Sequence, residues 1–192
     1  IDILVNNAGI LRDKTFAKMT LEDFRKVLDV HLMGTVTCTH ACWPIFREQK
    51  YGRVVMTSSS SGLYGNFGQA NYGAAKAAMI GLMNVLHQEG ARDDIRVNTL
   101  SPTAATRMTR DLLPEESHAF LAPETITPGL LYLVSENAPS RRILAAGAGC
   151  FALTRIYETA GITLSDEANT PEAVAAAFDQ LADANGQTEM TT

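Results

Sequence analysis

Residues 58–76 read SSSSGLYGNFGQANYGAAK, and this stretch decides how the rest of the chain is interpreted. Tyr72 and Lys76 lie four residues apart, so they share one face if the segment is helical. A phenol is a weak acid at neutral pH, and a nearby ammonium lowers its pKa because it stabilises the phenolate. We therefore interpret Tyr72 as a candidate general acid/base and Lys76 as its electrostatic partner.

A serine hydroxyl upstream of the tyrosine can hold the oxygen of a substrate carbonyl or alcohol. Ser59 precedes the tyrosine by 13 residues and is the preferred candidate, with Ser60 as the alternative. We interpret Ser58 and Ser61 as residues of a polar loop. Tyr64 has no lysine four residues further on, so we interpret it as part of the wall of the site.

Short apolar strands alternate with helical patterns along the chain. Strands are predicted at 1–5, 52–58, 95–101 and 143–146, and helices at 20–49, 69–92, 123–136 and from 170 to about 185. Thr20 with Asp23 three residues on resembles a capping box. The strand at 143–146 is expected to be the last of the sheet, residues 150–157 to be extended, and residues 187–192 to fray. The alternation predicts an α/β fold, a parallel sheet with helices on both faces.

Four motifs follow one another in an order typical of a single superfamily. They are Asn6-Asn7-Ala8-Gly9, the serine 13 residues before the tyrosine, Tyr72-x-x-x-Lys76, and Asn98-Thr99-Leu100-Ser101-Pro102. The chain therefore resembles the short-chain dehydrogenase/reductase superfamily, over most of its length. Residues 64–72, with Val30-His31-Leu32 upstream, look closest to the (3R)-hydroxyacyl-CoA dehydrogenase domains of peroxisomal multifunctional enzymes of type 2 and their bacterial relatives.

This resemblance implies a Rossmann-like doubly wound parallel sheet and a Ser–Tyr–Lys catalytic site. Ser59 would orient the substrate oxygen, Tyr72 would exchange the hydroxyl proton, and Lys76 would also bind ribose hydroxyls of the cofactor. His31 stands where most of the superfamily has an asparagine that helps to hold a proton-relay water. The multifunctional-enzyme branch carries histidine here too, and a hydrogen-bonded core histidine is the alternative.

Two segments are candidates for cofactor binding. Asn7, Ala8 and Gly9 follow the first strand, and open α/β sheets bind ligands beyond the carboxyl ends of their strands. The resemblance adds the segment Ala104, Ala105, Thr106 and Arg107, with Thr106 at the nicotinamide carboxamide. The family's usual Pro-Gly is Pro102-Thr103 in this chain. Arg107 and Arg110 are candidates for coenzyme A phosphates, with a solvated loop as the alternative.

The resemblance implies NAD as the cofactor and leaves NADP open. A nucleotide-binding sheet of this family begins with a strand, a glycine-rich turn and a helix that receives the pyrophosphate. This chain begins at its strand 1–5, so we expect the fold to be truncated at its N-terminus, without the first strands and the glycine-rich turn. Residues 1–158 are expected to form the C-terminal part of the dinucleotide-binding domain, and residues 159–192 a C-terminal extension with one helix.

The activity that the resemblance implies is NAD-dependent oxidation of a (3R)-hydroxyacyl-CoA to the 3-oxoacyl-CoA. The alternatives are an NADPH-dependent 3-oxoacyl-carrier-protein reductase and a noncatalytic fragment that acts as a dimerisation partner. An acyl-CoA is therefore the expected substrate, and a homodimer through the two long helices is the expected assembly. The expected location is cytoplasmic in a bacterium and peroxisomal in a eukaryotic multifunctional enzyme.

The composition excludes several other classes of protein. With 192 residues and 46% hydrophobic residues, the chain has the length and composition of one globular domain. A net charge of −5 argues against nucleic acid as the main partner. No apolar run approaches the ~20 residues of a membrane span, so no membrane partner is expected. Cys38, Cys42 and Cys150 are not joined by a second ligand pair at metal-like spacing, so no metal is expected.

Overall fold

The computed structural model describes residues 1–109 and 114–191, which form two compact units. The first unit is Ile1–Thr154, and the second begins at Arg155. The boundary expected after residue 158 lies inside the second unit, because the strand β6 (Tyr157–Glu158) pairs with β7 (Thr188–Glu189) of that unit.

Strands and helices alternate along the first unit. Its strands are β1 (Ile3–Asn6), β2 (Gly52–Thr57), β3 (Ile95–Thr103), β4 (Ile143–Gly147) and β5 (Cys150–Thr154). Its α-helices are α1 (Leu21–Leu28), α2 (Gly34–Gln49), α3 (Ser60–Tyr64), α4 (Ala70–Gly90) and α5 (Thr127–Leu133). A π-helical turn, η2 (Asp29–Met33), joins α1 to α2. Short 3-10 segments are η1 (Phe16–Lys18), η3 (Ala91–Asp93), η5 (Glu115–Ser117) and η6 (Pro123–Thr125).

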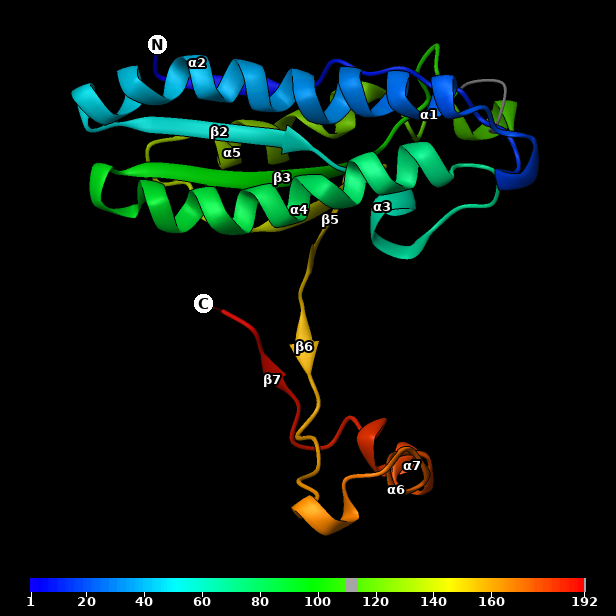
Figure 1. The fold of residues 1–192 in the computed structure, drawn as a ribbon. Helices are drawn as coiled ribbons and strands as arrows, with labels where there is room; N and C mark the ends of the chain where they lie inside the picture. The colour runs from blue at the N-terminus through cyan, green and yellow to red at the C-terminus, as the bar shows by residue number, and fades with distance from the viewer. Residues whose placement is uncertain (110–113, 192) are drawn as a thin grey trace. The chain divides into compact units, whose positions relative to one another are not determined.

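The five strands form one sheet in the order β1-β2-β3-β4-β5, in which the first four strands are parallel and β5 is antiparallel. Helices α2 and α4 cover one face of this sheet, and α5 covers the other (Figure 1). The predicted α/β fold with a doubly wound parallel sheet is therefore confirmed.

The core consists of two hydrophobic clusters, one on each face of the sheet. Val54 and Met56 of β2 pack in one cluster with residues of α2 and α4, including Phe46 and Met79. Val55, between them, packs in the other cluster with residues that include those of α5. Successive side chains of a strand point to opposite faces, so this division shows that β2 is buried on both sides.

The long helical segment after Thr20 begins as predicted but is not uniform. The Thr20 side chain accepts a hydrogen bond from the Asp23 backbone N–H at 3.1 Å, which caps α1. The helical path then runs to Gln49, interrupted only by the π turn Asp29–Met33. This π turn was not predicted from the apolar pattern of the segment.

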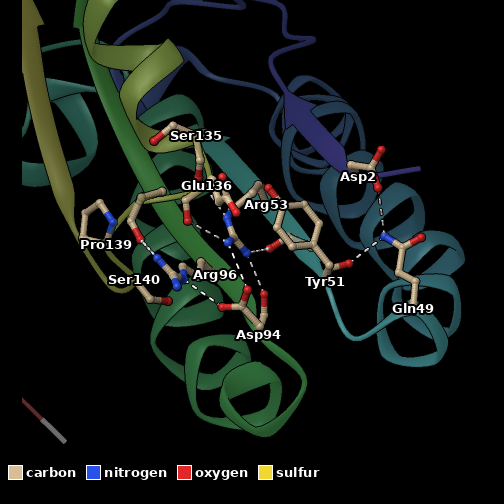
Figure 2. Close-up of polar contacts among 12 residues, drawn as sticks. Asp2, Gln49, Tyr51, Arg53, Asp94, Arg96, Ser135, Glu136, Pro139 and Ser140 are labelled. Atoms are coloured by element: carbon tan, nitrogen blue, oxygen red, sulfur yellow. Dashed lines mark hydrogen bonds and ion pairs between the residues drawn. The ribbon is translucent and has the colours of Figure 1, made fainter.

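A completely buried arginine ties the amino ends of β2 and β3 to the segment that precedes β4 (Figure 2). Arg53 donates to the backbone oxygens of Ser135 and Glu136, both at 3.0 Å. It also donates to the backbone oxygen of Asp94 at 2.7 Å and to its carboxylate at 3.1 Å. Tyr51 covers the guanidinium from one side, with the central carbon 4.1 Å from the ring centroid.

Three predicted elements of the first unit differ from the structure. The third strand runs past Pro102 to Thr103, and the predicted helix at 123–136 is shorter, consisting of η6 and α5. The strand at 143–146 is not the last strand of the sheet. Ala148 and Gly149 adopt positive φ angles of 51° and 73°, which forms a tight two-residue hairpin and returns the chain as β5.

The second unit contains the hairpin β6–β7, the 3-10 segment η7 (Asp166–Ala168) and the helices α6 (Pro171–Ala176) and α7 (Phe178–Leu181). Thr170 caps α6 by accepting from the Ala173 N–H at 3.2 Å. The predicted single helix is broken at Ala177, and residues 188–189 form a strand where fraying was predicted. Among its described residues, none is buried.

Candidate active site

The catalytic candidates meet where β2 ends and α4 begins. Lys76 is buried, and its Nζ donates to the backbone oxygen of Thr57 at 2.6 Å. The same Nζ lies 5.6 Å from the centroid of the Tyr72 ring. Ser59 is hydrogen-bonded to the Tyr72 side chain. The structure therefore brings together the serine, the tyrosine and the lysine that the sequence singled out.

A glycine allows the serine turn to lie directly against the helix that carries the tyrosine. A Cβ added at Gly62 of α3 would lie 2.6 Å from the backbone carbonyl carbon of Lys76 and 2.7 Å from the backbone nitrogen of Ala77. Any side chain at this position would therefore push α3 away from α4. Because Ser59 is the N-cap of α3, this close approach places its hydroxyl beside the tyrosine.

The four consecutive serines have different roles in the structure. Ser59 is half-buried, and its hydroxyl accepts from the Ser61 N–H at 3.2 Å, whereas Ser60 is exposed. Ser58 lies in the loop after β2, as interpreted, whereas Ser61 lies in α3, so its interpretation as a loop residue was wrong; both are buried. Ser58 donates to the backbone oxygen of Lys76 at 2.9 Å, and Ser61 donates to the side chain of Gln69 at 2.7 Å.

Burial is the main cause of the shifted pKa values of Tyr72 and Lys76. It raises the pKa of Tyr72 above its ordinary value, because loss of hydration disfavours the phenolate more than the hydrogen bond from Ser59 stabilises it. The nearby charge of Asp13 also raises this pKa. Burial lowers the pKa of Lys76 to about 8. The expectation that the lysine lowers the tyrosine pKa below its ordinary value is therefore not met in this structure.

His31 lies in the π turn, is buried, and contacts Tyr72. The His31 and Tyr72 rings meet edge to face, with centroids 5.2 Å apart. Its Nε2 lies 2.8 Å from the backbone oxygen of Ile10 and 3.1 Å from the backbone nitrogen of the same residue. Its Nδ1 is buried without a hydrogen-bond partner in the described structure. Burial lowers the pKa of His31, so the neutral form is favoured.

The segment after β1 lies beside this histidine. Asn7 and Ala8 are exposed, and the Asn7 side-chain oxygen accepts from the Thr57 hydroxyl at 3.1 Å. A Cβ at Gly9 would lie 2.3 Å from Cε1 of His31, so the position has no room for a side chain. This segment is therefore a partly exposed stretch of backbone held against His31 beyond the carboxyl end of β1, the position at which open α/β sheets bind ligands.

The segment after β3 is closed on itself. Ala105 is buried and its N–H donates to the backbone oxygen of Leu121 at 2.7 Å. The Thr106 N–H donates to the hydroxyl of Thr109 at 2.9 Å, and Thr109 in turn donates to the backbone oxygen of Ala104. The Thr106 hydroxyl accepts from the backbone N–H of Met108 at 3.2 Å. Arg107 is exposed. Arg110, the second candidate for coenzyme A phosphates, lies outside the described residues.

A sequence model of the short chain dehydrogenase family matches residues 1–117. The chain belongs to the short-chain dehydrogenase family. It is therefore a member of a family of oxidoreductases that use a nicotinamide cofactor, NAD or NADP.

Three relatives show how this dehydrogenase chain compares with known proteins. It is 46% identical over 184 residues to a short-chain type dehydrogenase/reductase of Mycobacterium tuberculosis. This match covers 95% of this chain and 64% of that protein. It is 44% identical over 186 residues to the peroxisomal hydratase-dehydrogenase-epimerase of Saccharomyces cerevisiae, covering 95% of this chain and 21% of that protein. The structure of full-length peroxisomal multifunctional enzyme type 2 from Drosophila melanogaster matches with a TM-score of 0.89 and 37% identity, over 98% of this chain and 35% of that one. The chain thus spans only part of each relative.

The described residues also bear on the expectations for metal ligands, cysteines and membrane spans. Its residues include no cluster of three or more histidine, cysteine or acidic side chains that could hold a metal ion. Cys42 packs against the core, whereas Cys38 and Cys150 are exposed free thiols. In the part of the chain that the structure describes, no helix is both long and apolar enough to span a membrane.

Proposed function

We propose that the whole protein oxidises a (3R)-hydroxyacyl-CoA to the 3-oxoacyl-CoA with NAD. The observation that carries this proposal is the convergence of Ser59, Tyr72 and Lys76 at the carboxyl end of β2. The similarity to a hydratase-dehydrogenase-epimerase and to a multifunctional enzyme supports the choice of an acyl-CoA substrate.

Each of the three residues has a separate role in this proposal. Ser59 donates a hydrogen bond to the substrate oxygen and keeps it within reach of the phenol. Tyr72 removes the proton of the substrate hydroxyl as general base. Lys76, fixed by its bond to the Thr57 carbonyl, stabilises the phenolate that acts as this base. When bound, the nicotinamide cofactor accepts the hydride from the substrate carbon.

Further residues are proposed to bind the cofactor and to complete the site. Asn7, Ala8 and Gly9 would line the nicotinamide on one side, and the segment from Ala104 through Ala105 and Thr106 to Arg107 on the other. The ammonium of Lys76 would also bind ribose hydroxyls. His31 is proposed as a catalytic residue whose unpartnered Nδ1 takes part in the proton path, since it is buried against the Tyr72 ring.

We also propose that the protein forms a homodimer through α2 and α4. Both helices expose large apolar side chains, which include Met33 beside the start of α2, Ile45 on α2 and Val85 on α4. Exposed apolar surface of this kind often marks a protein–protein interface. Sedimentation of the whole protein should show a dimer that Val85→Glu dissociates; an unchanged dimer would contradict this interface.

Turnover by a Tyr72→Phe variant tests the proposed chemistry. In the whole protein, this change should abolish oxidation of a (3R)-hydroxyacyl-CoA while NADH binding, followed by fluorescence, remains close to normal. Tyr64→Phe is the matched control, because Tyr64 is a nearby exposed phenol whose hydroxyl lies 3.0 Å from the hydroxyl of Thr154. Retained turnover in Tyr72→Phe would defeat the role of the phenol.

Two comparisons decide the cofactor and the substrate carrier. Titration of the whole protein and of residues 1–192 with NADH and with NADPH should show NADH binding by the whole protein. Binding by the whole protein alone would mean that residues 1–192 are an inactive part of a dehydrogenase. Faster reduction of a 3-oxoacyl-carrier-protein thioester with NADPH than oxidation of the CoA thioester would assign the protein as a carrier-protein reductase instead.

A further inference from the structure

A buried amide joins the loop after β1 to the two segments that carry Ser59 and Tyr72. Gln69 is 7% exposed and immediately precedes α4. Its side-chain nitrogen donates to the carboxylate of Asp13 at 2.7 Å. Its side-chain oxygen accepts from the hydroxyl of Ser61 at 2.7 Å and from the side chain of Asn66 at 3.0 Å. One side chain therefore links the distant loop at Asp13 to α3 and to the turn before α4.

A second set of bonds fixes the same loop to the first turn of α4. Asn71 is completely buried, and its side-chain nitrogen donates to the backbone oxygen of Arg12 at 3.0 Å. Its side-chain oxygen accepts from the backbone N–H of Tyr72 at 2.7 Å. The Lys14 N–H donates to the backbone oxygen of Gly68 at 2.9 Å. The tyrosine thus directly follows Asn71 and lies three residues after Gln69, and the side chains of these two residues bind the loop at Arg12 and Asp13.

The groups that act on the tyrosine come from four elements. Lys76 reaches it from α4, His31 from the π turn, Ser59 from the start of α3, and Asp13 from the loop after β1. Asp13 is the only carboxylate among these groups. It is exposed to solvent, and only one of its oxygens is engaged by the amide of Gln69.

We propose that Asp13 is a positioning residue for this site, which acts through Gln69 to fix the serine turn and the first turn of α4 relative to each other. The inference rests on the proposed function for its kinetic part. Without the carboxylate, the buried amide nitrogen of Gln69 loses its acceptor, and a buried donor without a partner is costly. The amide would then turn toward another acceptor, which moves Ser61 and with it the N-cap serine of α3. The carboxylate also places one negative charge near the phenol and favours its protonated form.

Two substitutions of Asp13 separate these effects. Asp13→Asn keeps a side-chain oxygen for the Gln69 amide but removes the charge, so kcat at its optimal pH should stay within about twofold. Asp13→Ala removes the acceptor as well, so kcat should fall roughly tenfold or more, because small displacements of reacting groups are costly, while KM for NAD changes little. Asp23→Asn is the control, because Asp23 faces Arg12 of the same loop at 3.7 Å and has no bond to Gln69.

The pH profile adds a readout that a purely structural role would not change. Oxidation requires the phenol to act as a base, so the rate rises with pH through the titration of Tyr72. Loss of the negative charge at Asp13 should move this limb of the profile to lower pH in Asp13→Asn, and Asp23→Asn should leave it in place. A wild-type kcat in Asp13→Ala together with an unmoved limb in Asp13→Asn would overturn the inference.

A measurement without turnover keeps this inference separate from the proposed function. The absorbance of tyrosinate, taken as the difference between each protein and the same protein carrying Tyr72→Phe, follows the titration of Tyr72 alone. The midpoint should lie lower in Asp13→Asn than in the wild-type chain, and an equal midpoint would count against Asp13. If the wild-type protein turns over no hydroxyacyl-CoA, the proposed function fails, but this titration still tests the placement of Asp13.

Discussion

Lys76 is a charged side chain in an interior position, and its environment explains its altered pKa. It is 4% exposed and has one acceptor, the carbonyl of Thr57 at 2.6 Å. One hydrogen bond replaces only part of the hydration that an ammonium loses on burial. Burial therefore lowers the pKa of Lys76 to about 8, so the charged and neutral forms of the lysine are equally populated near that pH.

The lysine should make the stability of the fold depend on pH. Because the folded pKa is about 8 and the ordinary value is 10.5, the unfolded state binds more protons between these two values. The free energy of unfolding should therefore rise by up to about 3 kcal/mol from pH 7 to pH 10, relative to a Lys76→Met variant. Urea unfolding of both proteins at the two pH values measures this difference. An identical pH dependence in the variant would show that the lysine is not the cause.

Gly9 and His31 should be energetically coupled, because they occupy the same space. Gly9→Ala puts a methyl group 2.3 Å from the present position of His31 Cε1, so the ring has to move. We expect a loss of roughly 1–3 kcal/mol in urea unfolding, as for other overpacked positions. In a His31→Ala background the same change should cost much less. Equal losses in both backgrounds would place the strain elsewhere.

For individual residues, the spacing in the sequence predicts which side chains meet, but it does not predict how the surrounding structure shifts their pKa values. The four-residue interval placed Tyr72 and Lys76 on one face of α4, because a helical period is local information. The sign of the tyrosine pKa shift depends on burial, and also on Ser59 and Asp13, which lie in other segments. Asp13 and Gln69 were missed for the same reason, since their bond spans 56 positions of the chain.

The contact between the helices α3 and α4 depends on the absence of a side chain at Gly62. Gly62 lets the backbone of α3 lie against the backbone of α4. Gly73 of α4 also lies close to α3, since a Cβ at this glycine would be 3.0 Å from the backbone oxygen of Ser61. At a greater separation of α3 from α4, the N-cap serine of α3 and the lysine of α4 would not reach the same site.

Gly62→Ala should therefore reduce catalysis and stability together. The new Cβ meets backbone atoms, which cannot rotate away, so we expect a loss of about 1–3 kcal/mol and a fall in kcat. Gly81→Ala is the matched control on α4, because a Cβ there meets nothing within 4 Å. The control should stabilise the helix by roughly 0.5–1 kcal/mol. Normal kcat in Gly62→Ala would show that the two helices can separate without harm to the site.

The elements were predicted well where the pattern is periodic and poorly where a local turn decides the path. Runs of branched apolar residues identified β1 to β4, and Thr20 identified the start of α1. The segment of β5 was expected to be extended, but its antiparallel pairing with β4 was not predicted, because the tight hairpin depends on Ala148 in an uncommon left-handed conformation. The break at Ala177 was missed because alanine favours helix at every position.

For the whole first unit, Arg53 connects elements at the amino ends of the strands, the end of the sheet opposite Ser59, Tyr72 and Lys76. Its guanidinium binds four backbone oxygens and one carboxylate, which belong to the first residue of β2 and to the segments before β3 and β4. Asp94 is 43% exposed at its side chain, so its charge remains partly hydrated. Arg53 therefore contributes to the stability of the fold mainly through its hydrogen bonds to buried carbonyl groups.

Arg53→Leu should destabilise the fold strongly without changing the site directly. Several carbonyls would lose their donor inside the protein, so we expect a loss on the order of 3 kcal/mol in urea unfolding. Arg96→Leu is the control, because Arg96 binds the same carboxylate at 2.9 Å but is 33% exposed at its side chain. The control should lose clearly less. Equal losses in the two variants would mean that burial of Arg53 adds nothing.

The π turn Asp29–Met33 fixes how much length variation the gene can accept in this region. The helix before it packs against α4, and the helix after it packs on β1 and β2. Loss of one codon between Leu28 and Gly34 would let the segment continue as an ordinary α-helix, but it would rotate one flank by about 100° relative to the other. Either α1 would lose its partner, or His31 would turn away from Gly9. Deletion of Asp29 or Met33, the two exposed residues of the turn, should thus be tolerated far less than a substitution at the same position.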